Sequence, residues 1–117
     1  MLVLLPTNRD QLQMYLSDLR GRILEHDAEI LDRLSDNELR RRSYALQKVA
    51  LDETIVHLGR AREREIVTLL ADATAAMRRA VTGMEAALER IDHPVGLVSA
   101  LKLVVELAAT IAETASS

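Results

Sequence analysis

The chain has 117 residues, of which 49% are hydrophobic and 28% are charged, and its net charge is −3. These values exclude a disordered chain, and the mild negative charge argues against non-specific nucleic-acid binding. Because there is no cysteine, a disulfide scaffold, a thiolate zinc site and cysteine catalysis are excluded. We expect one domain over residues 1–117, with residues 1–6 as an apolar N-terminal tail.

The kinds of apolar residue predict an all-α fold. The chain has no Phe and no Trp and only two Tyr, so Leu, Ala, Ile, Val and Met must build the core. These residues suit helix packing, whereas β-proteins draw on aromatic and β-branched side chains. With four Gly and two Pro, the chain has few turn signals, which favours long helices. We expect no sheet of three or more strands.

The first predicted helix begins after Pro6, with Thr7 as its N-cap, and runs to about Leu34. Its apolar residues recur at spacings of three, four and seven, which places them on one helical face. They are Leu12, Leu16, Leu19, Ile23, Ile30 and Leu34. His26 falls on the same face. Because an unperturbed His titrates near pH 6.5, His26 is a candidate pH-sensitive residue at a helix interface.

The second predicted helix begins at Ser35 and Glu38, which fit a capping box. Its apolar row is Leu39, Leu46, Val49 and Val56, interrupted by Arg42 and Glu53. We favour one long helix over residues 36–91 between two shorter helices, because the residues around Gly59 otherwise favour helix. The alternative is a turn near Gly59, which would give a four-helix up-down bundle.

A heptad row of larger residues follows from Val67 to Ile91, and a row of small residues runs beside it. Asp92, His93 and Pro94 then separate this segment from a last helix that is apolar on most sides. One partner helix cannot cover both faces, so we expect a homodimer through residues 67–111. The predicted interface residues are Ala73, Ala76, Ala80, Gly83, Ala87, Leu97, Leu101, Val104, Ala108 and Ile111.

His57, followed by Gly59 and Arg60, is the main candidate for chemistry. Histidine phosphotransfer domains are helical bundles of about this size with a phosphorylatable His on an exposed face, but their Lys–Gly spacing is not present here. The paired Glu-x-x-His motifs of di-iron bundles do not occur either. No Gly-rich phosphate loop is present. We therefore expect no enzyme, no metal site and no cofactor.

Two basic clusters and one long apolar segment complete the survey. Acidic residues are interleaved with the arginines of residues 60–64, and no aromatic residue is available to stack on bases. We interpret this cluster and the consecutive arginines of residues 40–42 as solvated surface. Residues 94–112 approach the length of a membrane span, but Lys102 and Glu106 lie in the middle. A central Lys costs about 2.5–3.5 kcal/mol on insertion, so we expect no span and a cytoplasmic protein.

The sequence thus predicts a non-enzymatic helical interaction or assembly module, adaptor-like or chaperone-like, that binds itself and another protein. Two alternatives stay open. One is a histidine phosphotransfer-like signalling bundle that would use His57. The other is a nucleic-acid-binding helical protein.

Overall fold

The computed structural model describes residues 4–116, and within this range it contains six α-helices and no strand. The predicted all-α fold is therefore confirmed. The helices are α1 (Arg9–Glu25), α2 (Asp27–Arg33), α3 (Glu38–Leu58), α4 (Glu63–Asp72), α5 (Thr74–Leu88) and α6 (Pro94–Ser116).

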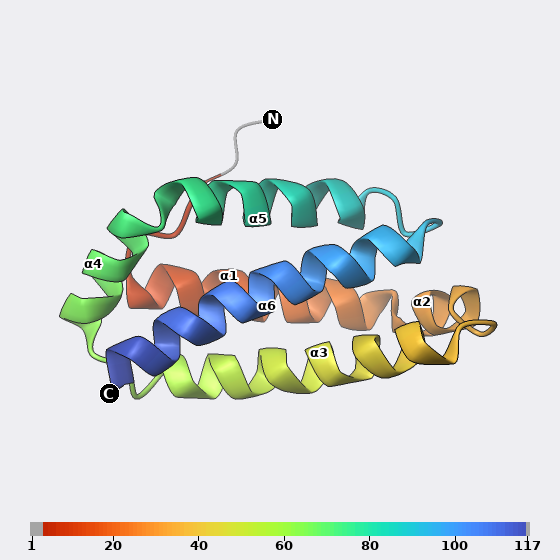
Figure 1. Cartoon of the computed structure of the whole chain (residues 1–117), viewed down its shortest axis with the longest axis horizontal. Coiled ribbons are helices and arrows are strands. Elements are labelled where there is room, and N and C mark those ends of the chain that lie inside the picture. Colours follow the sequence, from red (N-terminus) through yellow and green to blue (C-terminus); the bar gives the residue numbers. More distant parts are fainter. Residues whose placement is uncertain (1–3, 117) are drawn as a thin grey trace.

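Four long helices, α1, α3, α5 and α6, lie roughly side by side, and the chain reverses direction between successive ones (Figure 1). The short helix α4 crosses one end of this bundle, and α2 lies at the other end. α6 runs diagonally between α3 and α5 and packs against both, while α1 packs against α3. The core consists of the facing apolar rows of these helices, including the row predicted for the first helix from Leu12 to Leu34.

The predicted continuous helix over residues 36–91 is wrong, and the alternative turn near Gly59 is present. α3 ends at Leu58, Gly59 is its C-cap, and α4 begins at Glu63. The turn allows α4 and α5 to fold back onto α6, where they bury Ile66, Leu70, Met77 and Met84. A straight helix would separate α5 from α3, so that α6 could not pack against both, and the burial that the turn allows therefore stabilises it.

Side chains of α1 hold this turn by donating to one carbonyl group in the last turn of α3 and to one in the connection that follows it. Gln13 Nε2 donates to the carbonyl oxygen of Ile55 at 2.9 Å, and Arg9 Nη1 donates to that of Ala61 at 3.0 Å. Arg9 also pairs with Glu63 at the start of α4, with 3.3 Å between Nε and Oε2. The last carbonyls of a helix have no partner within the helix, so α1 supplies partners that the local sequence lacks.

Two predicted helix boundaries differ from the structure by one or two residues. The N-cap of α1 is Asn8, whose side chain accepts from the Gln11 amide, so Thr7 is not the cap. The N-cap of α3 is Asn37, whose side chain accepts from the Arg40 amide, in place of the Ser35 capping box. In both cases an Asn nearer the helix provides an equally good hydrogen-bond acceptor for capping.

Two further breaks divide the predicted long segments. The first helix stops at Glu25, and His26 joins α1 to α2. At the junction of α4 and α5, the Thr74 hydroxyl donates to the carbonyl oxygens of Leu70 at 3.2 Å and Ala71 at 2.9 Å. A hydroxyl that bonds back to the preceding turn bends a helix, which explains the change of direction at Ala73.

Asp27 ties α2 to α3. Its Oδ1 accepts hydrogen bonds from Tyr44 Oη and Lys48 Nζ, each at 2.7 Å. Partial burial disfavours the charged carboxylate, but the hydrogen bonds from Lys48 and Tyr44 and the charge of Lys48 outweigh this effect. The pKa of Asp27 consequently lies below its usual value. The buried Tyr44 ring is thereby fixed on the inner side of α3.

We expect Arg9→Ala to lower the free energy of unfolding by about 1–2 kcal/mol, because it leaves the Ala61 carbonyl without its donor and removes the pairing with Glu63. Urea unfolding followed by circular dichroism measures this change. Arg78→Ala, which removes an exposed arginine from α5, is the matched control and should have little effect. Equal stability of the two variants would contradict the proposed role of Arg9.

We expect Asp27→Asn to lower the free energy of unfolding at neutral pH but not in acid, where the wild type has already lost the contribution of the charged Asp27. The pKa of Asp27 is lower in the folded chain than in the unfolded chain, so its contribution is present above the unfolded pKa and is lost as the pH falls through the folded pKa. In urea unfolding, the variant should be less stable by roughly 1 kcal/mol at neutral pH and no less stable at about pH 2.5. Asp36→Asn, at an exposed position, is the control. A difference that is the same at both pH values would refute the assignment.

Candidate interaction surface

α3 carries apolar residues on two opposite sides. Its inner side contributes Tyr44, Leu51 and Leu58 to the core, each at most 1% exposed. These residues are seven apart, so they lie close to one line along the helix. Gln13, Asp27 and the ion pair between Arg20 and Asp52 hold this side against α1 and α2. The other side of α3 is therefore fixed toward solvent.

The side turned to solvent carries a second row, which we call the outer α3 face. It consists of Leu39, Arg42, Leu46, Val49, Glu53 and Val56. The four apolar members are exposed by 77%, 67%, 56% and 55%, in chain order. Successive members are alternately three and four residues apart, which is the spacing of a helix-packing seam. α3 lies at one edge of the bundle, so this face is open along its length (Figure 1).

This row is the apolar row predicted for the second helix, and the structure places it on the surface. The row that enters the core, from Tyr44 to Leu58, was missed. This buried row also includes Thr54, whose hydroxyl donates to the Ala50 carbonyl oxygen at 2.8 Å. The seven-residue spacing of Tyr44, Leu51 and Leu58 was the signal that could have found it.

The predicted dimer interface is mostly covered within one chain. Six of its residues are buried: Ala80, Leu97, Leu101, Val104, Ala108 and Ile111. Ala73, Ala76 and Ala87 are half-buried, and Gly83 is exposed. The prediction assumed that residues 36–91 form one helix with an uncovered side. The turn after Leu58 instead brings α5 and α3 against α6, so these side chains find their partners in the same chain.

The two histidines singled out for function are both exposed. His26 lies at the junction of α1 and α2, with Nδ1 4.0 Å from Oε2 of Glu29. Its predicted place in an apolar interface is wrong, because α1 ends before it. His57 lies near the end of α3 on an exposed position, as the phosphotransfer hypothesis requires, and that hypothesis stays untested. Among residues 4–116, no group of three or more His, Asp or Glu side chains could hold a metal ion.

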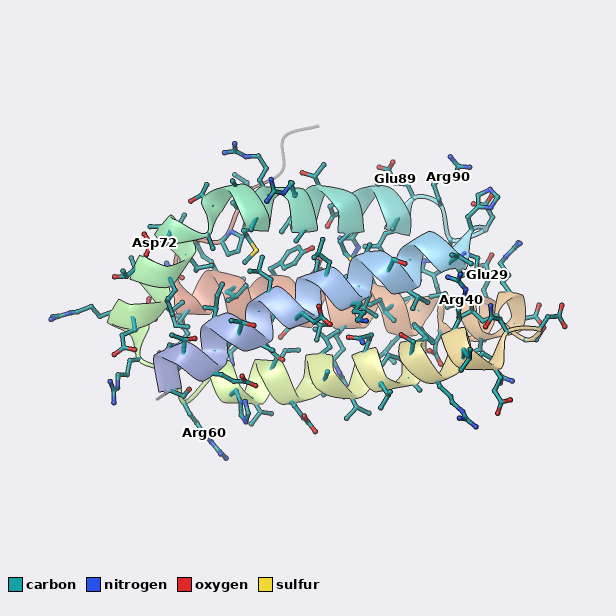
Figure 2. All side chains as sticks on the ribbon, in the orientation of Figure 1. Glu29, Arg40, Arg60, Asp72, Glu89 and Arg90 are labelled. Carbon is teal, nitrogen blue, oxygen red and sulfur yellow. The ribbon has the colours of Figure 1, made fainter. Side chains whose placement is uncertain are left out.

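Basic residues lie at both ends of the bundle. Figure 2 shows Arg60 and Arg90 projecting from opposite ends of the bundle. Several other arginines are paired with carboxylates, among them Arg42 with Glu38 and Arg62 with Glu65. Neutralised and dispersed arginines give a weak attraction for a phosphate backbone.

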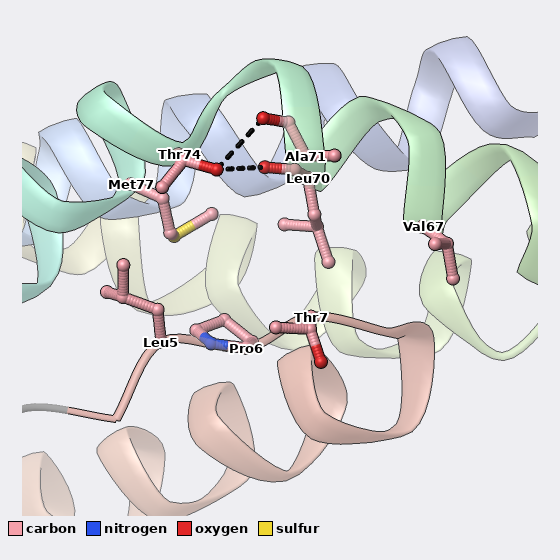
Figure 3. Close-up of a pocket in the computed structure, with 8 residues that line it drawn as sticks. All are labelled: Leu5, Pro6, Thr7, Val67, Leu70, Ala71, Thr74 and Met77. Atoms are coloured by element: carbon pink, nitrogen blue, oxygen red, sulfur yellow. Dashed lines mark hydrogen bonds between the residues drawn. The ribbon is translucent and has the colours of Figure 1, made fainter.

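A pocket of about 310 Å³ lies between residues 5–7 and the junction of α4 with α5 (Figure 3). Its lining is Leu5, Pro6, Thr7, Val67, Leu70, Ala71, Thr74 and Met77. None of these side chains is ionisable, and the Thr74 hydroxyl donates to carbonyl oxygens at the end of α4. The pocket can accommodate an apolar group, and its lining contains no ionisable acid or base.

A bidentate ion pair links α1 to α5. Arg22 donates from Nη1 and Nη2 to the two carboxylate oxygens of Glu85, at 2.9 and 2.8 Å. Nearby, the Tyr15 hydroxyl is buried and has no hydrogen-bond partner among the described residues. Burial, reinforced by the charge of Glu85, raises the pKa of Tyr15, so this hydroxyl stays protonated.

Among the described residues, α6 is the one helix that is long enough and apolar enough to cross a membrane, judged by length and composition alone. Of its most apolar 18-residue window, 44% is buried within the folded chain. The core helix of a bundle has the same composition, because it is covered by neighbours on several sides.

The comparison of this chain with known proteins is negative at every level. No model of a protein family, no curated protein sequence and no solved structure matches it. Within residues 4–116, the outer α3 face is the longest regular row of exposed apolar side chains, and it has the spacing of a helix–helix contact.

Proposed function

We propose that this chain is a non-enzymatic interaction module that binds protein through its outer α3 face. One observation carries the proposal. Four large apolar side chains, Leu39, Leu46, Val49 and Val56, are each more than half exposed and lie in one row on a helix whose opposite side is already buried.

Exposing such a row of apolar side chains to water is unfavourable, so binding of a partner that covers the row is favoured. Single exposed apolar residues are common on protein surfaces, but a contiguous row is typical of a binding site. The alternating spacing of three and four residues presents ridges and gaps that a second helix can fill. A partner helix laid along α3 would remove all four side chains from water at once.

The support for α3 makes this face suitable for binding. Tyr44 and Lys48 are bonded to Asp27, and Gln13 is bonded to the Ile55 carbonyl, so α3 is anchored near both ends. A helix fixed on one side loses little conformational entropy when its other side binds. The face is thus preorganised as an assembly or adaptor surface.

Photo-crosslinking tests the proposed function. A benzophenone amino acid in place of Val49 should form discrete covalent adducts with protein in the cells that produce the chain, whether with a second copy or with another protein. The same group in place of Val95, an exposed valine at the start of α6, is the matched control and should give none. Each adduct is identified by mass spectrometry and formed again from purified components. Absence of adducts at position 49, or equal yields at both positions, would overturn the proposal.

A further inference from the structure

We infer that the outer α3 face binds the same face of a second copy of this chain, with the two α3 helices antiparallel and in one register. In this register Arg42 faces Glu53 of the partner subunit, and the apolar residues face one another. The inference rests on the proposed function and names its partner.

The order of residues along the face carries this inference. From either end, the row reads apolar, charged, apolar, apolar, charged, apolar, and its spacings of three, four, three, four and three residues also read the same in both directions. The charged position is Arg42 from one end and Glu53 from the other. A two-fold axis midway between Leu46 and Val49 therefore matches every member with a complementary member of the partner.

The resulting contacts are specific. Leu39 faces the partner's Val56, and Leu46 faces the partner's Val49. Arg42 and Glu53 each meet the opposite charge, so the two-fold axis produces two equivalent ion pairs. Ala45 and Ala50 lie on either side of the row, and such small side chains let two helices approach closely.

Other pairings of the same face bring unfavourable contacts. A parallel pairing in register places Arg42 against the partner's Arg42, and Glu53 against the partner's Glu53. Shifting the antiparallel pair by one heptad places Arg42 against either the partner's Leu46 or the partner's Arg60. Like charges, or a charge facing an apolar side chain, disfavour these arrangements, so the charged positions select one register.

Both charged groups are available for a contact between subunits. Among residues 4–116, Glu53 has no ion-pair partner. Arg42 Nη2 lies 2.9 Å from Oε1 of Glu38 on the same helix, and the two side chains are 71% and 78% exposed. Such an exposed pair is weak, and an Arg has further donors for a second carboxylate.

Charge reversal tests the register. Sedimentation equilibrium of the purified chain should show a reversible dimer. Arg42→Glu and Glu53→Arg should each weaken dimerisation by at least about tenfold, because each places like charges together at both pairs. An equimolar mixture of the two variants should form a heterodimer, and the double variant should form a homodimer, both with nearly wild-type affinity. All positions are exposed, and circular dichroism confirms that each variant is folded.

Disulfide formation tests the antiparallel orientation independently, because the chain has no cysteine of its own. The variant carrying Leu39→Cys and Val56→Cys should oxidise to a covalent dimer. Each single variant should not, because equivalent residues of the two subunits would lie about 25 Å apart along the helices, well beyond the reach of a disulfide. A mixture of the single variants should again cross-link.

Any one of three results would overturn the inference. The wild-type chain is monomeric throughout the concentration range, the single charge variants dimerise as well as the wild type, or the single cysteine variants cross-link as well as their mixture. If the chain is monomeric but the benzophenone at position 49 captures a different protein, this inference fails and the proposed function stands. If no adduct forms with any protein, both fail.

Discussion

α6 needs apolar neighbours on most of its circumference, and the rest of the bundle is arranged to supply them. Only Lys102, Glu106 and Glu113 are charged along its 23 residues, so leaving it on the surface would expose most of its apolar side chains to water. α3 and α5 pack along its two sides, and α4 packs near its C-terminal end. To bring α3 and α5 together in this way the chain must turn after Leu58. The turn is stabilised by hydrogen bonds from α1 and by the Arg62 amide, which donates to the Ala115 carbonyl oxygen of α6 at 3.3 Å.

The same arrangement explains why the exposed apolar row lies on α3. A helix that packs against α1 and α6 through one side has its opposite side turned outward, and in α3 that side also carries large apolar residues. In α5, by contrast, the outward positions include Arg78 and Arg79, which suit contact with water. The surface row on α3 is therefore not required by the fold of the single chain. The pairing of two copies that we propose would account for its palindromic order of apolar and charged residues.

The apolar periodicity of the sequence predicted some parts of the fold well and others wrongly. The row from Leu12 to Leu34 and the heptad positions from Leu70 to Met84 enter the core as expected, apart from Thr74, because each of those segments has one dominant apolar face. α3 has two apolar faces, and periodicity does not say which of them is buried. The longer row is the one predicted as the apolar row of this helix, whereas the row with Tyr44, which the hydrogen bond to Asp27 fixes inward, is the one that packs. Most of the predicted interface residues, from Ala80 on α5 to Ile111 on α6, are buried within the same chain.

By itself, the sequence determined that this protein is helical and where most of its apolar rows lie. It also determined that helix boundaries exist near residues 35–37 and 92–94. These features follow from composition, spacing and capping residues, which act over a few neighbouring residues. Only the tertiary structure decided that the chain turns after Leu58 and which side of α3 meets solvent. The local sequence from Gly59 to Glu65 is compatible with helix, and the energy that favours the turn comes from burying Ile66, Leu70 and Met77 against helices distant in the sequence. The bonds from Arg9 and Gln13 to carbonyl groups more than 40 positions away act in the same direction, and no local pattern records them.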